Sequence, residues 1–323
     1  MTEIRIATRG SMLALWQAEH IRSELHRLNP ALRTSLLVLR TQGDRILDRP
    51  LSEVGGKGLF TKEIEEALLD GRADLAVHSM KDLPSTLPPG LRLAAIPPRA
   101  EAADALLLAP AHQPLRGEDQ GASALLAALP AGARVGTSSL RRVCQLRHLR
   151  PDLQVLPLRG NVDTRLRRVE RGELDAAVLA EAGLARLGWQ EHIALRFSPT
   201  EMLPACGQGA LGLECREDNL ALLSLLSQLG DRATTAAVLA ERAFSLHLGG
   251  SCQTPLGALA TLHRTPAGQR LRIAGMVGSI DGLSLLRDEI EGPADAPSEL
   301  GQRLGDRLLS AGAGALLRAE QAA

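Results

Sequence analysis

The chain has 323 residues, of which 45% are apolar and only 2% aromatic, and its 37 basic side chains balance 37 acidic ones. This apolar fraction excludes a disordered chain, and the length is enough for two or three domains. No apolar run approaches the roughly 18 residues of a membrane span. The zero net charge argues against a protein that binds nucleic acid with its whole surface.

The first hundred residues alternate short strands with helices. Strands are predicted at 4–8, 35–40 and 74–78. Helices are predicted at 13–28 and 59–69, the second ending before Gly71. This rhythm is typical of a parallel sheet covered by helices.

The rhythm pauses at a predicted linker, 97–104, and at a polar, irregular stretch, 110–123, and then restarts. Strands are predicted at 134–136, 153–158 and 175–179, and helices at 139–149 and 162–171. The strand-to-helix turn at 6–11 resembles the one at 135–139, and 71–77 resembles 172–178. We therefore predict two α/β lobes of similar layout that face a central cleft.

The pattern changes after Met202. A glycine turn at 207–213 leads into a strand, and a long helix is predicted at 231–248. Three strands that we expect to be antiparallel, at 255–262, 270–276 and 283–289, are followed by a closing helix at 298–309. These elements predict a smaller α+β domain. The predicted domains are therefore 1–98 with 202–218, 103–198, and 222–323.

Two strand-to-helix turns carry hydroxyl groups, Thr8–Ser11 and Gly136–Ser139. Free backbone N–H groups and the helix dipole at such turns favour a bound anion. Ordinary N-capping by Ser or Thr is the alternative, and for a single turn it is the better explanation. Two turns in matching places make the two interpretations about equal.

Charge is concentrated in residues 134–172, which hold ten arginines against three acids, a local charge of +7. Arg141 and Arg142 follow Ser139 in the first turn of a predicted helix, where cations oppose the helix dipole and a bound anion would offset that cost. A solvated arginine pair is the alternative. Arg167, Arg168 and Arg171 are expected to face solvent. The segment has no aromatic residues on which bases could stack, which disfavours nucleic acid.

The segment His78–Pro84 follows a predicted buried strand, where ligands gather in α/β sheets. Lys81 is placed to hold an anion, and Asp82 to transfer a proton or stabilise a cation. A surface ion pair is the alternative. The chain has only three lysines, Lys57, Lys62 and Lys81, and their clustering hints at sites that need an ammonium group.

The four cysteines match no zinc or disulfide pattern. Cys144 and Cys215 lie in apolar patterns and are predicted to be buried. Cys206 and Cys252 lie in glycine-flanked loops, and spacing alone does not decide which of them is a reactive thiol. The cysteine usage and the absence of an apolar signal core in residues 1–10 predict a cytoplasmic protein.

Six segments, in order along the chain, resemble the porphobilinogen deaminase (hydroxymethylbilane synthase) family. They are 6–17, 54–60, 76–84, 136–142, 158–165 and 252–255. The resemblance implies two lobes like those of periplasmic binding proteins and a smaller C-terminal domain. It implies a transferase of tetrapyrrole, and hence porphyrin and heme, biosynthesis that condenses four porphobilinogen molecules head to tail with release of ammonia. The product, hydroxymethylbilane, is freed by hydrolysis from a covalent dipyrromethane primer.

The resemblance also implies roles for single residues. It makes Cys252 the thioether attachment point of the dipyrromethane cofactor, which decides between the two loop cysteines, and it makes Asp82 the catalytic carboxylate. The implied cofactor-binding residues are Lys81, Thr137, Ser138, Ser139, Arg141, Arg142 and Arg165. The implied substrate-binding residues are Arg9, Ser11, Gln17, Arg159, Arg165 and Arg186. Lys57 and Phe60 belong to a glycine-rich loop that resembles the family's mobile lid.

Each porphobilinogen carries two carboxylates, so the resemblance implies a small anionic partner and gives no sign of a metal, nucleic acid or membrane. The family suggests a monomer. One position departs from the family pattern, because Ser251 stands where a second glycine usually precedes the cysteine. Two other classes of function remain as alternatives. These are a two-lobed module that binds an anion without converting it, and a nucleic-acid binder that uses residues 134–172.

Overall fold

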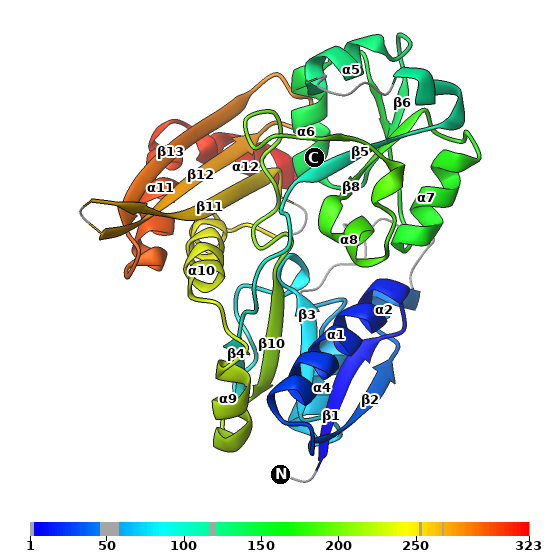
Figure 1. Ribbon diagram of the computed structural model, residues 1–323. Helices are drawn as coiled ribbons and strands as arrows, with labels where there is room; N and C mark the ends of the chain where they lie inside the picture. Colours follow the sequence, from blue (N-terminus) through cyan, green and yellow to red (C-terminus); the bar gives the residue numbers. More distant parts are fainter. Residues whose placement is uncertain (1–2, 46–57, 116–120, 252–253, 267, 323) are drawn as a thin grey trace. The chain divides into compact units, whose positions relative to one another are not determined.

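The computed structural model describes residues 3–45, 58–115, 121–251, 254–266 and 268–322 (Figure 1). Within these ranges the chain forms two compact units, Met1–Ala100 with Ala210–Thr235 and Glu101–Gly209 with Ala236–Ala323. The first unit holds one sheet, and the second holds two.

The first unit is an α/β lobe around a five-stranded sheet of order β2-β1-β3-β10-β4. Its strands are β1 (Glu3–Arg9), β2 (Arg33–Leu39), β3 (Leu75–Ser79), β4 (Leu91–Ala95) and β10 (Leu211–Arg216). Its helices are α1 (Met12–Leu28), α2 (Gln42–Arg45), α4 (Lys62–Leu69) and α9 (Leu220–Ser227), with a 3₁₀ turn η1 (Met80–Asp82). Strand β1 pairs with β2 and β3 in parallel, whereas β10 runs antiparallel to β3 and β4.

Helices cover both faces of this sheet because alternate strand residues are apolar on each side. Helix α1 buries Ile21 and Leu25 against one face, and α4 buries Ile64 and Leu68 against the other. Helix α4 ends at Leu69, and Gly71 has a φ of 69°, as the predicted stop requires.

The second unit begins with a lobe of the same topology, whose five-stranded sheet has the order β7-β6-β8-β5-β9. Its strands are β5 (Asp104–Leu108), β6 (Arg134–Gly136), β7 (Gln154–Leu156), β8 (Ala176–Ala180) and β9 (Ile193–Arg196). Its helices are α5 (Ala122–Ala128), α6 (Leu140–Leu149), α7 (Val162–Glu170) and α8 (Glu181–Arg186), with 3₁₀ turns η2 (Pro110–Leu115) and η3 (Gln190–His192). Strand β5 is antiparallel to β8 and β9, as β10 is to its neighbours in the first lobe. This match confirms the predicted pair of similar α/β lobes.

The second unit also holds an antiparallel sheet of order β11-β12-β13. Its strands are β11 (Leu256–Thr265), β12 (Gly268–Gly278) and β13 (Leu285–Pro293). Helices α10 (Arg232–His247), α11 (Pro297–Ser310) and α12 (Ala313–Ala322) accompany it. Phe244, Ile273 and Leu304 meet in one apolar core between the helices and the sheet. The predicted α+β arrangement of antiparallel strands and helices is confirmed.

Several details of the sequence prediction are wrong. Strands β4, β5 and β9 and helices α5, α8 and α9 have no predicted counterpart, and α12 rather than α11 closes the chain. Helix α9 buries Leu222 and Leu226 in the first lobe, so the boundary predicted at 222 comes too early. Residues 202–209 belong to the second unit, because Leu203 bonds there with Arg141 and Gln145.

Candidate active site

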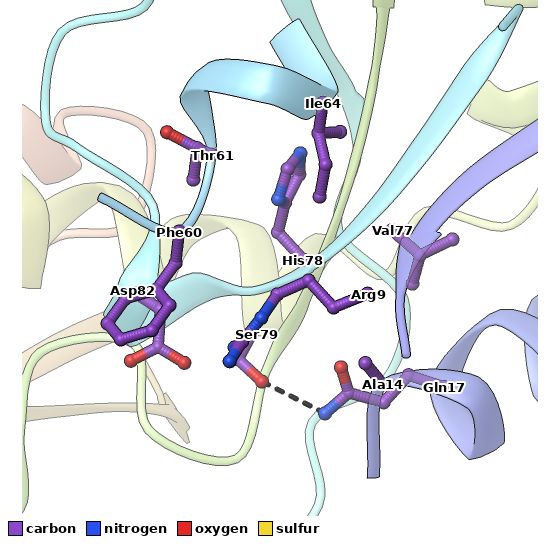
Figure 2. A pocket seen from close by; sticks show the side chains of 10 residues that line it. All are labelled: Arg9, Ala14, Gln17, Phe60, Thr61, Ile64, Val77, His78, Ser79 and Asp82. Carbon is purple, nitrogen blue, oxygen red and sulfur yellow. Dashed lines mark hydrogen bonds between the residues drawn. The ribbon is translucent and has the colours of Figure 1, made fainter. Parts of the chain in front are cut away.

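A first group of predicted site residues lies at the carboxyl ends of β1 and β3 (Figure 2). Arg9 ends β1, Ser79 ends β3, and Asp82 follows in η1. Because β1 and β3 are parallel neighbours, their carboxyl ends meet at one edge of the sheet. These three residues line a cavity together with Ala14, Gln17, Phe60, Thr61, Ile64, Val77 and His78.

Two contacts orient the side chains of this pocket. The guanidinium carbon of Arg9 lies 4.4 Å from the centroid of the Phe60 ring, a cation–π contact. Nε2 of Gln17 donates to Oγ of Ser79 at 2.9 Å (Figure 2). Asp82 is exposed, so its carboxylate is open to a ligand. The structure thus brings Arg9, Gln17, Phe60 and Asp82 together.

The other predicted residues of the first lobe have simpler surroundings. Ser11 is the N-cap of α1, and its hydroxyl accepts from the backbone N–H of Ala14 at 3.3 Å, so the capping interpretation holds for it. Lys81 is half-buried beside Asp82 in η1. Lys62 is exposed, with its Nζ 4.0 Å from the Glu66 carboxylate, which makes a surface ion pair.

Arg141 and Arg142 are buried, which excludes the alternative of a solvated pair. Both bind Asp104, a fully buried carboxylate on β5: Nη1 of Arg141 at 2.6 Å, and Nη2 and Nε of Arg142 at 2.7 and 3.0 Å. Burial alone would raise the pKa of Asp104, but the two guanidinium groups outweigh it and hold the pKa far below its usual range. The anion that offsets the unfavourable position of the two arginines in the first turn of α6 is therefore the Asp104 carboxylate of the chain itself.

The loop between β6 and α6 uses its hydroxyl groups locally. Oγ1 of Thr137 accepts from the N–H of Ser139 at 3.2 Å. Oγ of Ser138 donates to the carbonyl of Leu158 at 3.1 Å and accepts from its N–H at 3.0 Å. Ser139 is the N-cap of α6 without a capping bond from its side chain. Its hydroxyl is therefore not used by the helix end.

Three further arginines lie in the same lobe. Nε of Arg165 donates to the carbonyl of Gly160 at 2.7 Å, and Nη2 of Arg186 donates to the carbonyl of Gly209 at 2.6 Å. Burial lowers the pKa of Arg186 to about 10, which leaves it charged at neutral pH. Among the described residues, Nη1 of Arg159 and Nε of Arg141 are buried without a hydrogen-bond partner.

Two predicted residues, Lys57 and Cys252, lie outside the described part of the chain. Cys144 and Cys215 are buried as predicted, and burial raises the pKa of the Cys215 thiol to about 11. Cys206 is half-buried. Ser251 is exposed, and its N–H donates to Oγ1 of Thr254 at 2.9 Å.

The sequence analysis missed Asp104, Glu65 and Glu214, and it named His78 only as part of a motif. Each carried a usable signal. Asp104 begins the otherwise apolar strand β5 (Asp104–Leu108), and Glu214 lies in the largely apolar strand β10 (Leu211–Arg216); a buried charge at either place needs a partner. Glu65 lies between Ile64 and Ala67, on the apolar side of α4.

In the described ranges no three His, Cys, Asp or Glu side chains gather in a way that could hold a metal ion. No helix within the same ranges combines the length and the apolar character that crossing a membrane requires.

The chain thus has two α/β lobes of one topology, with guanidinium groups and a carboxylate at strand ends, an arrangement that suits an anionic small molecule. The chain belongs to the porphobilinogen deaminase family. The family model "Porphobilinogen deaminase, dipyrromethane cofactor binding domain" matches residues 4–224, and "Porphobilinogen deaminase, C-terminal domain" matches residues 235–310. The chain thus carries the family's cofactor-binding domain.

Full-length relatives agree with this assignment. A porphobilinogen deaminase of Syntrophotalea carbinolica is 51% identical over 98% of this chain and 95% of its own length. One of Chromobacterium violaceum is 50% identical over 99% of this chain and 98% of its own length. Among solved structures, the BvgS VFT2 domain of Bordetella pertussis is 14% identical with a TM-score of 0.41, over 70% of this chain and 86% of that chain.

Proposed function

We propose that this chain condenses four porphobilinogen molecules into hydroxymethylbilane, with Asp82 as its catalytic carboxylate and Cys252 as the attachment point of its dipyrromethane cofactor. The observation that carries the proposal is the pocket at the ends of β1 and β3. There an exposed Asp82 shares a cavity with Arg9 and Gln17. Family membership over nearly the whole chain supports the reaction.

The residues of the second lobe fit a ligand that carries several carboxylates. Buried N–H groups without a partner are rare, and Nη1 of Arg159 and Nε of Arg141 are two of them. Each can donate to a carboxylate oxygen, and Arg165 and Ser139 of the same lobe add further donors. The dipyrromethane, when bound, supplies the pyrrole carbon to which porphobilinogen is joined.

Asp82 has two tasks in this proposal. Loss of ammonia from porphobilinogen leaves a positive charge on the pyrrole, and a nearby carboxylate lowers the energy of that charge. The condensation also releases one proton, which the same carboxylate can accept. Arg9, held against Phe60, and Gln17, held by Ser79, are placed to bind the acidic side chains of porphobilinogen.

Cys252→Ser tests the attachment. We expect the purified wild-type chain to be heavier than its polypeptide by one dipyrromethane and Cys252→Ser to have the bare polypeptide mass, because a serine hydroxyl is a much poorer nucleophile than a thiolate. Intact-mass spectrometry under reducing conditions measures both. The matched control is Cys206→Ser, in the other glycine-flanked loop, which we expect to keep the added mass.

A bare wild-type chain that does not consume porphobilinogen would refute the enzyme proposal and favour a binding module. An added mass that is lost from Cys206→Ser and kept by Cys252→Ser would move the attachment to Cys206. We further propose that the protein is a cytoplasmic monomer, which size-exclusion chromatography with light scattering and cell fractionation test.

A further inference from the structure

A buried group of three titratable side chains lies next to the pocket of Asp82. The reaction proposed above does not use it. His78, Glu214 and Glu65 are 6%, 0% and 7% exposed. Nε2 of His78 lies 2.8 Å from Oε2 of Glu214. We call these three residues the buried acid–histidine cluster.

The fold brings the cluster together from three elements. In the antiparallel pair of β3 and β10, Gly212 stands opposite His78, so Glu214 is a diagonal neighbour of His78 on the same face of the sheet. Helix α4 covers this face, and it buries Glu65 beside Ile64 and Ala67. No one segment of the sequence contains the cluster.

The electrostatics of the cluster favour uptake of a proton. Burial raises the pKa of Glu65 and outweighs the Thr61 side chain, which lowers it; the Glu214 carboxylate raises this pKa and His78 lowers it. Oε1 of Glu65 and Oε1 of Glu214 are buried without a hydrogen-bond partner among the described residues. With one proton, two carboxylates and an imidazole carry a charge of −1. A second proton makes the cluster neutral, which a low-dielectric core favours.

The cluster borders the active-site cavity through His78. The imidazole and the Asp82 carboxylate both line this cavity, together with the hydroxyl-bearing Thr61 and Ser79 (Figure 2). The cavity volume of about 30 Å³ is large enough to hold water. Because Nε2 of His78 faces Glu214, Nδ1 is the ring nitrogen that does not contact this carboxylate.

We infer that the buried acid–histidine cluster is the proton acceptor that serves Asp82. The inference rests on the proposed function. In each condensation the proton released by the reaction passes to the Asp82 carboxylate, and from there through cavity water to Nδ1 of His78, which shares it with Glu214 and Glu65. Asp82 returns to its ionised form, and the proton leaves the enzyme with ammonia as ammonium. His78 relays the proton, and the two glutamates act through it as positioning residues.

Glu65→Gln tests the inference with little change of shape. The variant has one carboxylate fewer. A His78 imidazolium paired with the Glu214 carboxylate then has a summed charge of zero, so the pair accepts no further proton. We expect kcat to fall about a hundredfold with KM unchanged. The melting temperature should stay the same or rise, because a buried charge has been removed. A merely structural role of Glu65 predicts the opposite, a lower melting temperature without a selective effect on kcat.

The pH profile gives a second, independent result. In the wild type, activity should fall as pH drops through the apparent pKa of the cluster, because a neutral cluster accepts no proton. The charged groups facing His78 are Glu214 from β10, Glu65 from α4, and Asp82 and Arg9 across the cavity. We expect His78→Gln to lower kcat similarly and to remove this acid-side limb. An acid-side limb that is unchanged in both variants would overturn the inference.

The control is His112→Gln, which breaks a half-buried histidine–aspartate pair of 3.4 Å in the second lobe, with Asp175. It should leave kcat and the pH profile unchanged. A titration of the His78 ring followed by NMR needs no turnover, and Glu65→Gln should shift its midpoint; an unshifted midpoint would refute the coupling. Should the wild type make no hydroxymethylbilane, the proposed function fails, whereas the NMR result still decides whether the three groups share a proton.

Discussion

Asp82→Asn is expected to leave the dipyrromethane on the protein and to lower kcat by about a hundredfold to ten-thousandfold. Asparagine keeps the size of the side chain and its position in η1, but it carries no negative charge and accepts no proton. The developing positive charge then loses its counter-charge in the pocket that Arg9 and Gln17 share. Stopped assays of porphobilinogen consumption, with intact mass measured on the same sample, test both parts.

The matched control for this prediction is Asp70→Asn. Asp70 is an exposed carboxylate of the same lobe that pairs with Arg72 at 3.4 Å, and it is not part of the cavity lining. We expect its kcat to equal that of the wild type. Near-normal turnover of Asp82→Asn would contradict the catalytic assignment. A bare mass would instead mean that Asp82 is needed to assemble the cofactor.

The strand-and-helix rhythm could be predicted wherever an element has its own periodicity. Helix α1 and the three strands after α10 were predicted well because each buries one regular face. Strands β4, β5 and β9 were missed for a common reason. None of them continues the alternation of strand and helix by which the other short strands were predicted, and each takes its place in a sheet only through neighbours distant in sequence.

The sequence predicts which residues belong to the candidate site, but it does not predict which of their side chains pair with one another. The excess of arginine at 134–172 and the motif around Asp82 are visible along the chain. The partner of Arg141 and Arg142, Asp104, lies 37 and 38 residues away, at the start of an apolar strand. No local pattern links them, since β5 enters its sheet antiparallel between β8 and β9, which follow it by about 70 to 90 residues in the chain. His78 and Glu214, which are 136 residues apart, are another example.

Of the variants proposed here, Asp104→Asn is expected to lower the free energy of unfolding most. Asp104 is the carboxylate that Arg141, Arg142 and Gln208 all contact, at distances of 2.6–3.0 Å. Removing its charge leaves two buried guanidinium groups without compensation. Breaking a buried ion pair in this way costs about 3–5 kcal/mol. Urea unfolding of wild type and variant at pH 7 measures the difference in the free energy of unfolding.

The pH dependence of the difference in the free energy of unfolding shows whether the Asp104 charge causes it. The pKa of Asp104 is lowered in the folded protein, so the carboxylate stabilises the fold fully above its unfolded pKa of about 3.9 and loses this effect as pH falls toward its folded value. The difference in the free energy of unfolding between wild type and Asp104→Asn should therefore be constant from about pH 7 to pH 5 and become smaller in stronger acid. Asp70→Asn, which breaks the exposed pair with Arg72, is the control and should leave the urea midpoint unchanged. If this difference in the free energy of unfolding is small at pH 7, or does not change as pH falls into strong acid, Asp104 does not neutralise the arginine pair.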